Sequence, residues 1–425
     1  MLLLHDSSNL RSDIRFNQIL PNQMKKLLAI FTLFLISCGG NPSSGPVVAS
    51  SWDEIVKKAQ GTTLNMMMWQ GDPLINKYMA KWVAPELKKR YNIELRLLPG
   101  QGSEIVKILM TGIEQGEKTG SIDVCWINGE TFYQLRQINA LYGPFVDMLP
   151  NAKTIDGEDP FIKYDFQQLT EGFECPWGNV QMCIIYDSVR TPSPPRNLAQ
   201  LSEYVKAHPG KFTIPAEFAG MTLLKSWMTE LAGMGSGYFD GTFDSLKYAA
   251  TSEKLWHYIN ENRKYYWRNG ETFPEKLSAV HQMFANSELD FTLSNNDAEV
   301  DNKIAQGVFP GTAKAYVPDA GSIRNSHYLG IPSNSPNKNA ALVLINFLIS
   351  PEAQLQKMKP EVWGDGTVLD VKKLDAHWQQ EFSKASVRKS APSRQTLSQK
   401  AIKEPAPGYM IRLYSDFRNK IIGKQ

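Results

Sequence analysis

The chain has 425 residues, with 46 Lys and Arg against 43 Asp and Glu, and a formal net charge of +3. Charges scattered along a nearly neutral chain give no basis for proposing nucleic-acid binding. The six histidines are isolated and match no zinc-binding spacing, so we expect no metal site and no cofactor. The length exceeds what one hydrophobic core usually holds, and it predicts two lobes.

The N-terminus carries the features of an export signal. Lys25 and Lys26 precede the apolar run LLAIFTLFLIS, which is about half as long as a membrane-spanning helix. The residues Leu35–Cys38 resemble the lipobox of bacterial lipoproteins, whose cysteine receives a diacylglycerol; an ordinary buried helix is the alternative. We therefore expect, in order, an over-extended start (1–23), a lipoprotein signal peptide (24–37), lipidation at Cys38 and a flexible tether (38–51).

Strands alternate with helices from residue 62 onward, which is typical of a parallel α/β sheet. The predicted elements are strand 62–69, helix 74–91, strand 93–98, helix 104–111, strand 123–127 and a helix that follows Asn128. Asn128 is a residue type that caps helices, and the apolar residues of each helix recur at helical spacing.

Three of the predicted strands end in the same kind of turn: Trp69–Asp72, Gly100–Ser103 and Trp126–Glu130. Small residues, free backbone N–H groups and capping side chains would then meet at one edge of the sheet. This edge is where α/β proteins usually hold small molecules. Glycine and asparagine also serve simply to form turns, and this alternative stays open for each turn.

The cysteines suggest one disulfide candidate. Cys125 lies in the apolar strand DVCWI and is expected to be a buried thiol. Cys175 and Cys183 flank PWGNVQM, which is interpreted as a turn, and an exported protein meets an oxidising compartment. A disulfide between them and a pair of buried thiols are the two alternatives.

Two glycine-rich stretches fail to match catalytic motifs. In GMGSG (233–237) the serine is out of register for the nucleophile turn of a hydrolase. GEKTG (116–120) lacks the Gly-Lys pair of a phosphate-binding P-loop. A secreted hydrolase remains an alternative, but we expect a protein that is not an enzyme.

Residues 61 to 360 resemble the periplasmic solute-binding proteins of ABC importers. The resemblance rests on the order of four stretches: DVCWINGETFYQLRQINAL, CPWGNVQMCIIYDSVRTPSPPRNLAQL, GKFTIP and GIPSNSPNKNAALVLINFLISPEAQLQKM. GKFTIP together with SNNDAEVDNKIAQG resembles the YnjB group, whose importer is associated with thiamine-type solutes. The resemblance implies a two-lobed α/β fold of type II, a Venus flytrap in which each lobe is a central sheet flanked by helices.

The same resemblance implies a division of the chain. The expected parts are the first lobe (52–175), the second lobe (176–317), a return segment of the first lobe (318–357) and C-terminal helices on the second lobe (358–425). The strands that cross between the lobes are expected near Glu174–Val180 and Tyr316–Gly321, where Pro and Gly interrupt the pattern.

A ligand held between the lobes would be an organic cation such as thiamine, because aromatic rings and carboxylates occur together in the candidate wall. The candidate wall residues are Trp69, Gln70, Asp72, Gln101, Gly102, Ser103, Asn128, Gly129, Glu130, Trp177, Phe218, Asn295, Asn296 and Asp297. A sugar, a polyamine or an anion is an alternative ligand. For each candidate tryptophan a core role is equally open, and Trp126, which lies within a predicted strand, is expected to belong to the core.

The expected partners follow from the family resemblance. They are a small-molecule ligand, an ABC permease with its ATPase, and the membrane, reached through the N-terminal lipid, while the protein itself is expected to be monomeric. The resemblance places the chain in the periplasm as a membrane-anchored lipoprotein of the bacterial cell envelope. A lipoprotein that feeds a membrane sensor instead of a permease would have the same sequence features.

Overall fold

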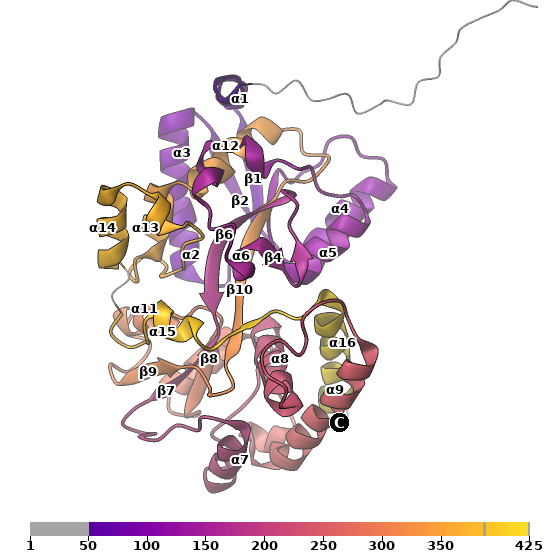
Figure 1. The fold of residues 1–425 in the computed structure, drawn as a ribbon, viewed down its shortest axis with the longest axis vertical. Coiled ribbons are helices and arrows are strands. Elements are labelled where there is room, and N and C mark those ends of the chain that lie inside the picture. The colour runs from indigo at the N-terminus through magenta and orange to yellow at the C-terminus, as the bar shows by residue number, and fades with distance from the viewer. Residues whose placement is uncertain (1–50, 386–387, 424–425) are drawn as a thin grey trace, which may run out of the picture. The chain divides into compact units, whose positions relative to one another are not determined.

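The computed structural model describes residues 51–385 and 388–423. The expected signal peptide, the lipidation site Cys38 and residues 38–50 of the expected tether lie outside these ranges. Two larger sheets with flanking helices, together with a two-stranded hairpin, form the described part of the chain (Figure 1). No helix within these ranges is both long and apolar enough to cross a membrane.

The first sheet has six strands. Five lie in the order β11-β10-β3-β1-β2, and β6 pairs with β10. The bounds are β1 (Thr63–Met68), β2 (Glu94–Pro99), β3 (Val124–Ile127), β6 (Glu174–Gln181), β10 (Ser322–Gly330) and β11 (Ala401–Lys403). β1 pairs in parallel with β2 and β3, so the predicted strands 62–69, 93–98 and 123–127 are confirmed.

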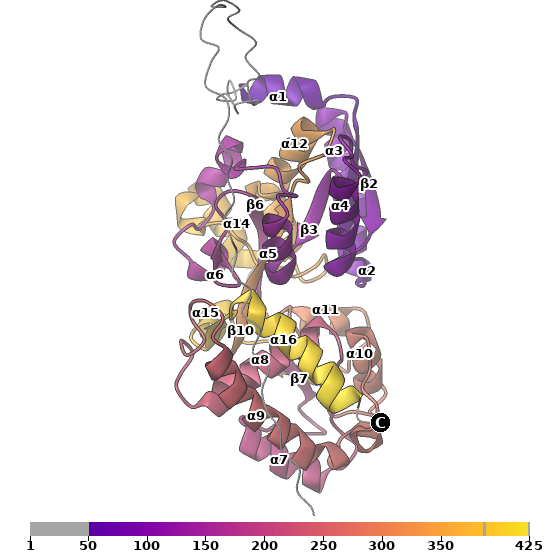
Figure 2. The ribbon, with the colours of Figure 1, turned by 90° about the vertical axis from the view of Figure 1, so that its right-hand side faces the viewer.

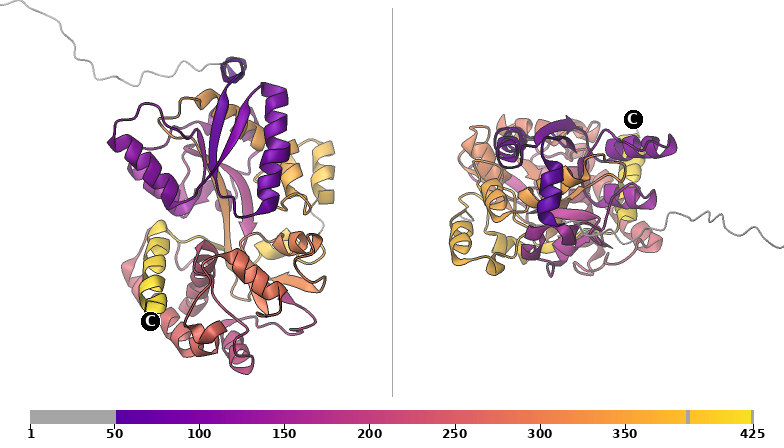
Figure 3. Two further views of the ribbon diagram at one scale, coloured as in Figure 1. Left: turned by 180° about the vertical axis from the view of Figure 1, so that it is seen from behind. Right: turned by 90° about the horizontal axis from the view of Figure 1, so that it is seen from above.

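Helices cover both faces of this sheet because apolar side chains leave its strands in both directions. Leu64 and Met66 of β1 pack with Leu87 of α3 on one face, whereas Met67 packs with Ile105 of α4 on the other. Figure 3 shows α3 and α4 on either side of these strands. The bounds are α1 (Trp52–Ala59), α2 (Pro73–Tyr78), α3 (Ala84–Tyr91), α4 (Ser103–Glu114) and α5 (Gly129–Gln137).

Two long antiparallel strands lead from the first sheet to the second. β6 and β10 pair over seven residue pairs, and a register shift lies between His327 and Tyr328 of β10. β6 is buried along its whole length and is followed, after Met182, by β7 (Cys183–Asp187). β7 is the middle strand of the second sheet, between β8 (Phe291–Ser294) and β9 (Ala313–Tyr316).

The helices of the second sheet enclose a separate apolar core. α8 is buried at most of its positions and packs against α9, and α16 lies beside them (Figure 2). The bounds are α7 (Leu198–Ala207), α8 (Phe218–Ala232), α9 (Ser245–Asn262), α10 (Leu277–Ala285), α11 (Glu299–Ala305), α15 (Arg394–Ser398) and α16 (Pro407–Phe417).

The chain after β10 returns to the first sheet. α12 (Lys338–Leu348) is buried almost throughout and lies against α1, and α13 (Pro351–Met358) follows it. The expectation placed all of 358–425 on the second lobe. Val368, Leu369 and Phe382 pack instead against Ile162 of α6 (Pro160–Lys163), so α14 (Ala376–Ala385) lies beside α13. The difference arises because these apolar side chains find a partner surface next to the first sheet.

The cysteine pair is not bonded. Cys175 and Cys183 are free, buried thiols, as is Cys125. The sequence suggests a turn between Cys175 and Cys183, but residues 174–181 form the extended strand β6. Eight extended residues span about 26 Å, whereas a disulfide needs Cα atoms within about 7 Å. The disulfide alternative is therefore wrong and the buried-thiol alternative is confirmed.

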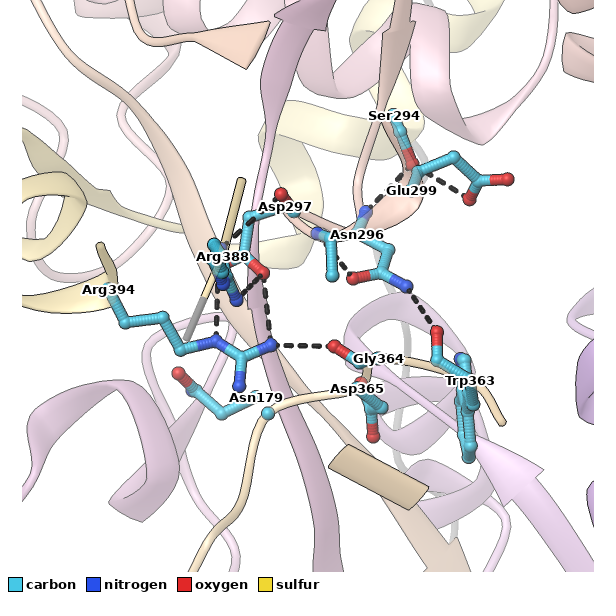
Figure 4. A network of polar contacts seen from close by, with 12 residues as sticks. Asn179, Ser294, Asn296, Asp297, Glu299, Trp363, Gly364, Asp365, Arg388 and Arg394 are labelled. Carbon is cyan, nitrogen blue, oxygen red and sulfur yellow. Dashed lines mark hydrogen bonds and ion pairs between the residues drawn. The ribbon is translucent and has the colours of Figure 1, made fainter. Parts of the chain in front are cut away.

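A buried loop, Trp363–Gly366, touches both sheet systems (Figure 4). The carbonyl of Trp363 accepts hydrogen bonds from Asn302 and from Asn296, whose Nδ2 lies 3.3 Å away. Gly366 accepts from the backbone N–H of Asn179 on β6 at 3.2 Å. The loop therefore ties one crossing strand to the helix α11 side of the second sheet.

Asp297 is the centre of an ion network at the same place. Its Oδ1 lies 2.7 Å from Arg388 Nη2 and 3.0 Å from Arg394 Nη2. Arg394 Nη2 also donates to the carbonyl of Gly364 at 2.8 Å. Burial raises the pKa of Asp297, but the guanidinium groups of Arg394 and Arg388 outweigh it and hold this pKa below its ordinary value. The carboxylate is thus committed to structural contacts.

Asp297→Asn is expected to lower the free energy of unfolding by about 3 kcal/mol, because it removes one member of a buried ion network and leaves two arginines without their counter-ion. The matched control is Asp319→Asn, which removes a carboxylate that is 58% exposed and pairs with Lys400; its cost should stay below about 1 kcal/mol. Urea unfolding of both variants measures the difference. Equal costs would contradict the structural role of Asp297.

Candidate functional site

The turn after β1 is held by Asp72. Its Oδ1 accepts hydrogen bonds from the N–H groups of Leu74 (2.7 Å) and Ile75 (3.2 Å), so Asp72 is the N-cap of α2. Its Oδ2 accepts from Lys303 Nζ of α11 at 3.0 Å. The carboxylate therefore bridges the end of a first-sheet strand and a helix of the second sheet.

Lys303 has a second acidic neighbour, Glu299, at 3.1 Å. Burial lowers the pKa of Lys303, but the carboxylates of Glu299 and Asp72 raise it more, and the net shift is upward. Burial raises the pKa of Glu299 above its ordinary value. One ammonium thus faces two carboxylates here, so this contact offers no free positive charge to a ligand.

The aromatic side chains near this turn form a connected cluster. The Trp69 indole lies over Gly71, where an added Cβ would sit 2.3 Å from the ring, and it meets Trp126 edge-on at 6.5 Å. Gln70 is fixed by its carbonyl, which accepts a hydrogen bond from Asn76 at 3.0 Å. Trp69 and Gln70 are partly exposed and stay candidates for the ligand wall.

Trp177 lies in the core of the first sheet and not in the ligand wall, where it was expected. It is fully buried among the rings of Trp126 and Trp363, each 5.1 Å away between centroids, and belongs to the core of the first sheet. The difference follows from its place in the middle of β6, a strand buried on both sides. Its Nε1 has no hydrogen-bond partner.

The second turn lies beside the third. Gly102 has a left-handed φ of 49°, and a Cβ added to it would lie 3.9 Å from Thr131 Oγ1. Gln101 and Ser103 are exposed. The structure therefore brings the predicted turns together at one edge of the first sheet.

The third turn is covered by a hairpin that the sequence does not predict as part of the site. The Phe166 ring lies so close to Gly129 that an added Cβ would be 2.1 Å from it. The backbone N–H of Gly129 lowers the pKa of Asp165, so the two groups lie close together, and Asn128 makes no side-chain cap. The hairpin consists of β4 (Tyr164–Asp165) and β5 (Gln168–Leu169). An acidic side chain of the chain itself thus already lies at the N-terminus of α5.

Three buried carboxyl groups lie near one another here: Asp165 of the hairpin, Glu130 of α5 and Glu174 of β6. Each has at least one side-chain oxygen that is buried and has no hydrogen-bond partner. Burial raises the pKa of Asp165 well above its ordinary value, and Glu130 and Glu404 raise it further. Burial raises the pKa of Glu174 and of Glu130 as well. Within the described ranges, no three acidic, His or Cys side chains are arranged to hold a metal ion.

Lys225 is the ammonium that faces these acids from the second sheet. It lies on α8, is 1% exposed and pairs with Glu404 Oε2 at 2.5 Å. Its Nζ lies 4.6 Å from the centroid of Phe166 and 5.4 Å from that of Phe218. The predicted wall residue Phe218 is thus brought to the same place as Glu130, whereas Lys225, Glu404 and Phe166 were missed.

The predicted segment after β8 has mainly structural contacts. Asn296 caps the next turn through Oδ1, which accepts from the Ala298 N–H at 3.0 Å, and Asp297 is held by its arginines. Asn295 Oδ1 is buried and without a hydrogen-bond partner. Asp297 is therefore not available to a ligand in this structure, while Asn295 remains a candidate.

Comparison with known proteins identifies the family. Residues 81–383 match the family model of the bacterial extracellular solute-binding proteins. Protein YnjB of Escherichia coli (strain K12) is 36% identical over 330 residues, which cover 77% of this chain and 84% of that protein. The chain belongs to the bacterial extracellular solute-binding proteins.

Solved structures of such binding proteins share the fold. The periplasmic binding protein AfuA from Actinobacillus pleuropneumoniae superposes with a TM-score of 0.59 at 12% identity, over 85% of this chain and 98% of that chain. PotD, a spermidine/putrescine substrate-binding protein from Streptococcus pneumoniae, gives 0.58 at 14% identity, over 84% and 99%. The expected two-lobed α/β fold is confirmed.

Membership of the solute-binding proteins settles the class of function. The chain is an extracellular solute-binding protein, and this family consists of binding proteins and not of enzymes. Solute-binding proteins of ABC importers take up small molecules and deliver them to a permease.

Asp165→Asn is expected to change how stability depends on pH. A carboxyl group with a raised pKa in the folded state contributes stability at low pH, and that contribution is lost as pH rises from its unfolded value near 3.9 through the folded value. The variant lacks this loss, so its melting temperature relative to the parent should increase between about pH 5 and about pH 8. Thermal unfolding across this range is the measurement. A constant difference would show that Asp165 does not take up a proton on folding.

Proposed function

We propose that this solute-binding protein captures a small organic cation, thiamine or a related molecule, between its two lobes and delivers it to an ABC permease. The observation that carries the proposal is the group of buried, unpartnered carboxyl oxygens of Glu130 and Asp165. These oxygens lie next to the aromatic ring of Phe166, which seats on Gly129, and the Phe218 ring shares the Lys225 ammonium with Phe166.

The charges of the site favour a cation over an anion. Lys303 and Lys225 face it, but each is already paired with a carboxylate at 3.1 Å or less. The N–H of Gly129, at the start of α5, already faces Asp165 and lowers its pKa. Among the ionisable groups of the site, those with an unpartnered buried atom are Glu130, Asp165 and Glu174, which are all acidic. A desolvated aromatic ring contributes about 1 kcal/mol or more to the binding of a cation.

Capture would work through closure of the lobes. A ligand that contacts both lobes lowers the free energy of the closed state relative to the open one. The contact between Asp72 and Lys303 already joins the two sheets at 3.0 Å, so closure adds contacts that are independent of the ligand. We place the first lobe around the first sheet and the second lobe around β7, β8 and β9, with β6 and β10 as crossing strands.

We further propose that Cys38 carries a lipid and that residues 38–51 tether the lobes to the membrane as a monomer beside the permease and its ATPase. The support is the sequence LIS-Cys38 after an apolar run. A flexible tether keeps the loaded protein at a high effective concentration near its permease.

Thiamine should raise the melting temperature of the purified chain. At about 100 times the dissociation constant, a ligand that binds only the folded state adds about 2.7 kcal/mol, which corresponds to a shift of several degrees. The control is thiochrome, a flat and neutral thiamine derivative, which should give a much smaller shift because it lacks the charge. Mass spectrometry of small molecules released by denaturation should return the ligand intact.

A cation other than thiamine among the released molecules would overturn the thiamine assignment and keep the class of ligand. An anionic or neutral ligand would overturn the class as well.

Cys38→Ser is expected to move the exported chain from the membrane fraction to the soluble fraction, because one covalent anchor is lost. The control variant Cys125→Ser alters a buried thiol of the first sheet and should stay in the membrane fraction. Fractionation followed by immunoblotting checks both. A membrane-bound Cys38→Ser chain would contradict the lipid anchor.

A further inference from the structure

A cavity of about 340 Å³ lies between the hairpin 164–169 and the segment after β11. The crossing strand β10 contributes Arg324 and Asn325 to its wall, and the segment after β11 contributes Glu404. A second cavity, in the core beside Trp227, holds only about 20 Å³, which is room for a water molecule and not for a solute. The larger cavity is of the size that ligand pockets have.

The charged side chains that line the cavity are neutralised with one exception. Glu404 pairs with Lys225 at 2.5 Å, Arg324 Nη2 lies 2.6 Å from Asp159, and Lys403 Nζ lies 2.5 Å from Asp240. These pairs cancel within the wall. The wall thus has no unpaired positive charge to offer an anion.

Asp165 is the exception. It is 2% exposed, it lines the cavity, and its Oδ2 has no hydrogen-bond partner. An uncompensated buried carboxylate is costly, so the site is electrostatically incomplete without a proton or a cation. The residual charge of the wall is therefore negative.

The wall also carries aromatic rings that already accept cations. Phe166 has the ammonium of Lys225 at 4.6 Å from its centroid, and Phe161 has the guanidinium of Arg324 at 4.7 Å. Tyr164 lines the same cavity and is 40% exposed. Rings of this kind stabilise a desolvated organic cation better than they stabilise a metal ion, which needs several oxygen ligands.

We propose that this cavity is the seat of the positively charged group of the solute, with Asp165 as its counter-ion. The proposal rests on the proposed function and deepens it, because it names one carboxylate and one cavity in place of the whole space between the lobes. The solute it fits has a protonated or quaternary nitrogen on a flat or apolar body that the rings can cover.

Capture is then coupled to loss of a proton. Asp165 is faced by Glu130 of α5, Glu174 of β6, Glu404 and Lys225, so the carboxyl groups around it outnumber the one ammonium. Burial and these carboxylates raise the pKa of Asp165. A proton and a cation therefore compete for the same carboxylate: the arriving cation displaces a bound proton to solvent, and binding weakens as pH falls.

The first experiment needs no knowledge of the solute. Tyr164→Cys places a thiol in the cavity wall, and Leu169→Cys places one on the exposed side of the same hairpin. Both full-length chains are treated with a cationic and an anionic methanethiosulfonate. The ratio of the reaction rate of the cationic reagent to that of the anionic reagent should be about tenfold higher at residue 164 than at residue 169, which corresponds to about 1.4 kcal/mol. Adding Asp165→Asn should remove this preference; equal preference at both positions would overturn the proposal.

The second experiment uses thiamine and choline as probes of binding by calorimetry in buffers of different ionisation enthalpy. Asp165→Asn should lose at least tenfold in affinity and release no proton. Asp319→Asn, which removes an exposed carboxylate that pairs with Lys400 and does not line the cavity, should bind like the parent.

The outcomes separate the two proposals. If a cation binds the parent and Asp165→Asn equally well, the assignment of Asp165 is wrong and solute capture stands. If neither probe binds but the reagent preference at residue 164 depends on Asp165, the cavity assignment stands and the thiamine-type assignment fails. The Tyr164→Cys chain retains Asp165, so this test does not depend on the folding of the Asp165→Asn variant.

Discussion

The pairing of β6 with β10 is the constraint on which the arrangement of the two sheets depends. These strands share one ladder of backbone hydrogen bonds and lead from the first sheet to the second. Side chains make the remaining contacts described between the sheets, such as Asp72 with Lys303 and Asn302 with Trp363. Side-chain pairs exchange partners at little cost, whereas a ladder of backbone hydrogen bonds persists. A change in the angle between the lobes would therefore break the side-chain contacts before the hydrogen bonds between β6 and β10.

Much of the first sheet follows from sequence pattern alone. Apolar strands such as Leu64–Met68 and the turns after them are local features, because alternation and helix caps involve residues that are near in sequence. The same reasoning placed Asp72 at the start of a helix, where the structure has it as an N-cap. It failed at Trp177, whose burial depends on rings contributed by residues 126 and 363, far away in the chain.

The parts that sequence did not predict are long-range by nature. Asp165 and Phe166 lie in a hairpin with no recognisable motif, and Glu404 reaches Lys225 across 179 positions. One signal was present: Lys225 is a single charged residue in the apolar stretch of α8, and a buried lysine requires a partner. Sequence could therefore have indicated that Lys225 is special, although not which acid pairs with it. The supposed turn between Cys175 and Cys183 was misread because Pro and Gly also occur in buried strands such as β6.

The burial of the Phe166 ring affects how the protein would interact with its permease. The ring comes from a hairpin next to the first sheet, yet it is 1% exposed and packs within the core of the second. Pulling it out exposes apolar surface at a cost of about 2 kcal/mol, enough for a population ratio of about thirty to one. A ligand-free binding protein that opens by withdrawing this hairpin would thus spend most of its time in the closed state. A permease that recognises only the closed conformation would then also bind ligand-free molecules. The permease would then have to distinguish ligand-bound from ligand-free molecules by their residence times on it.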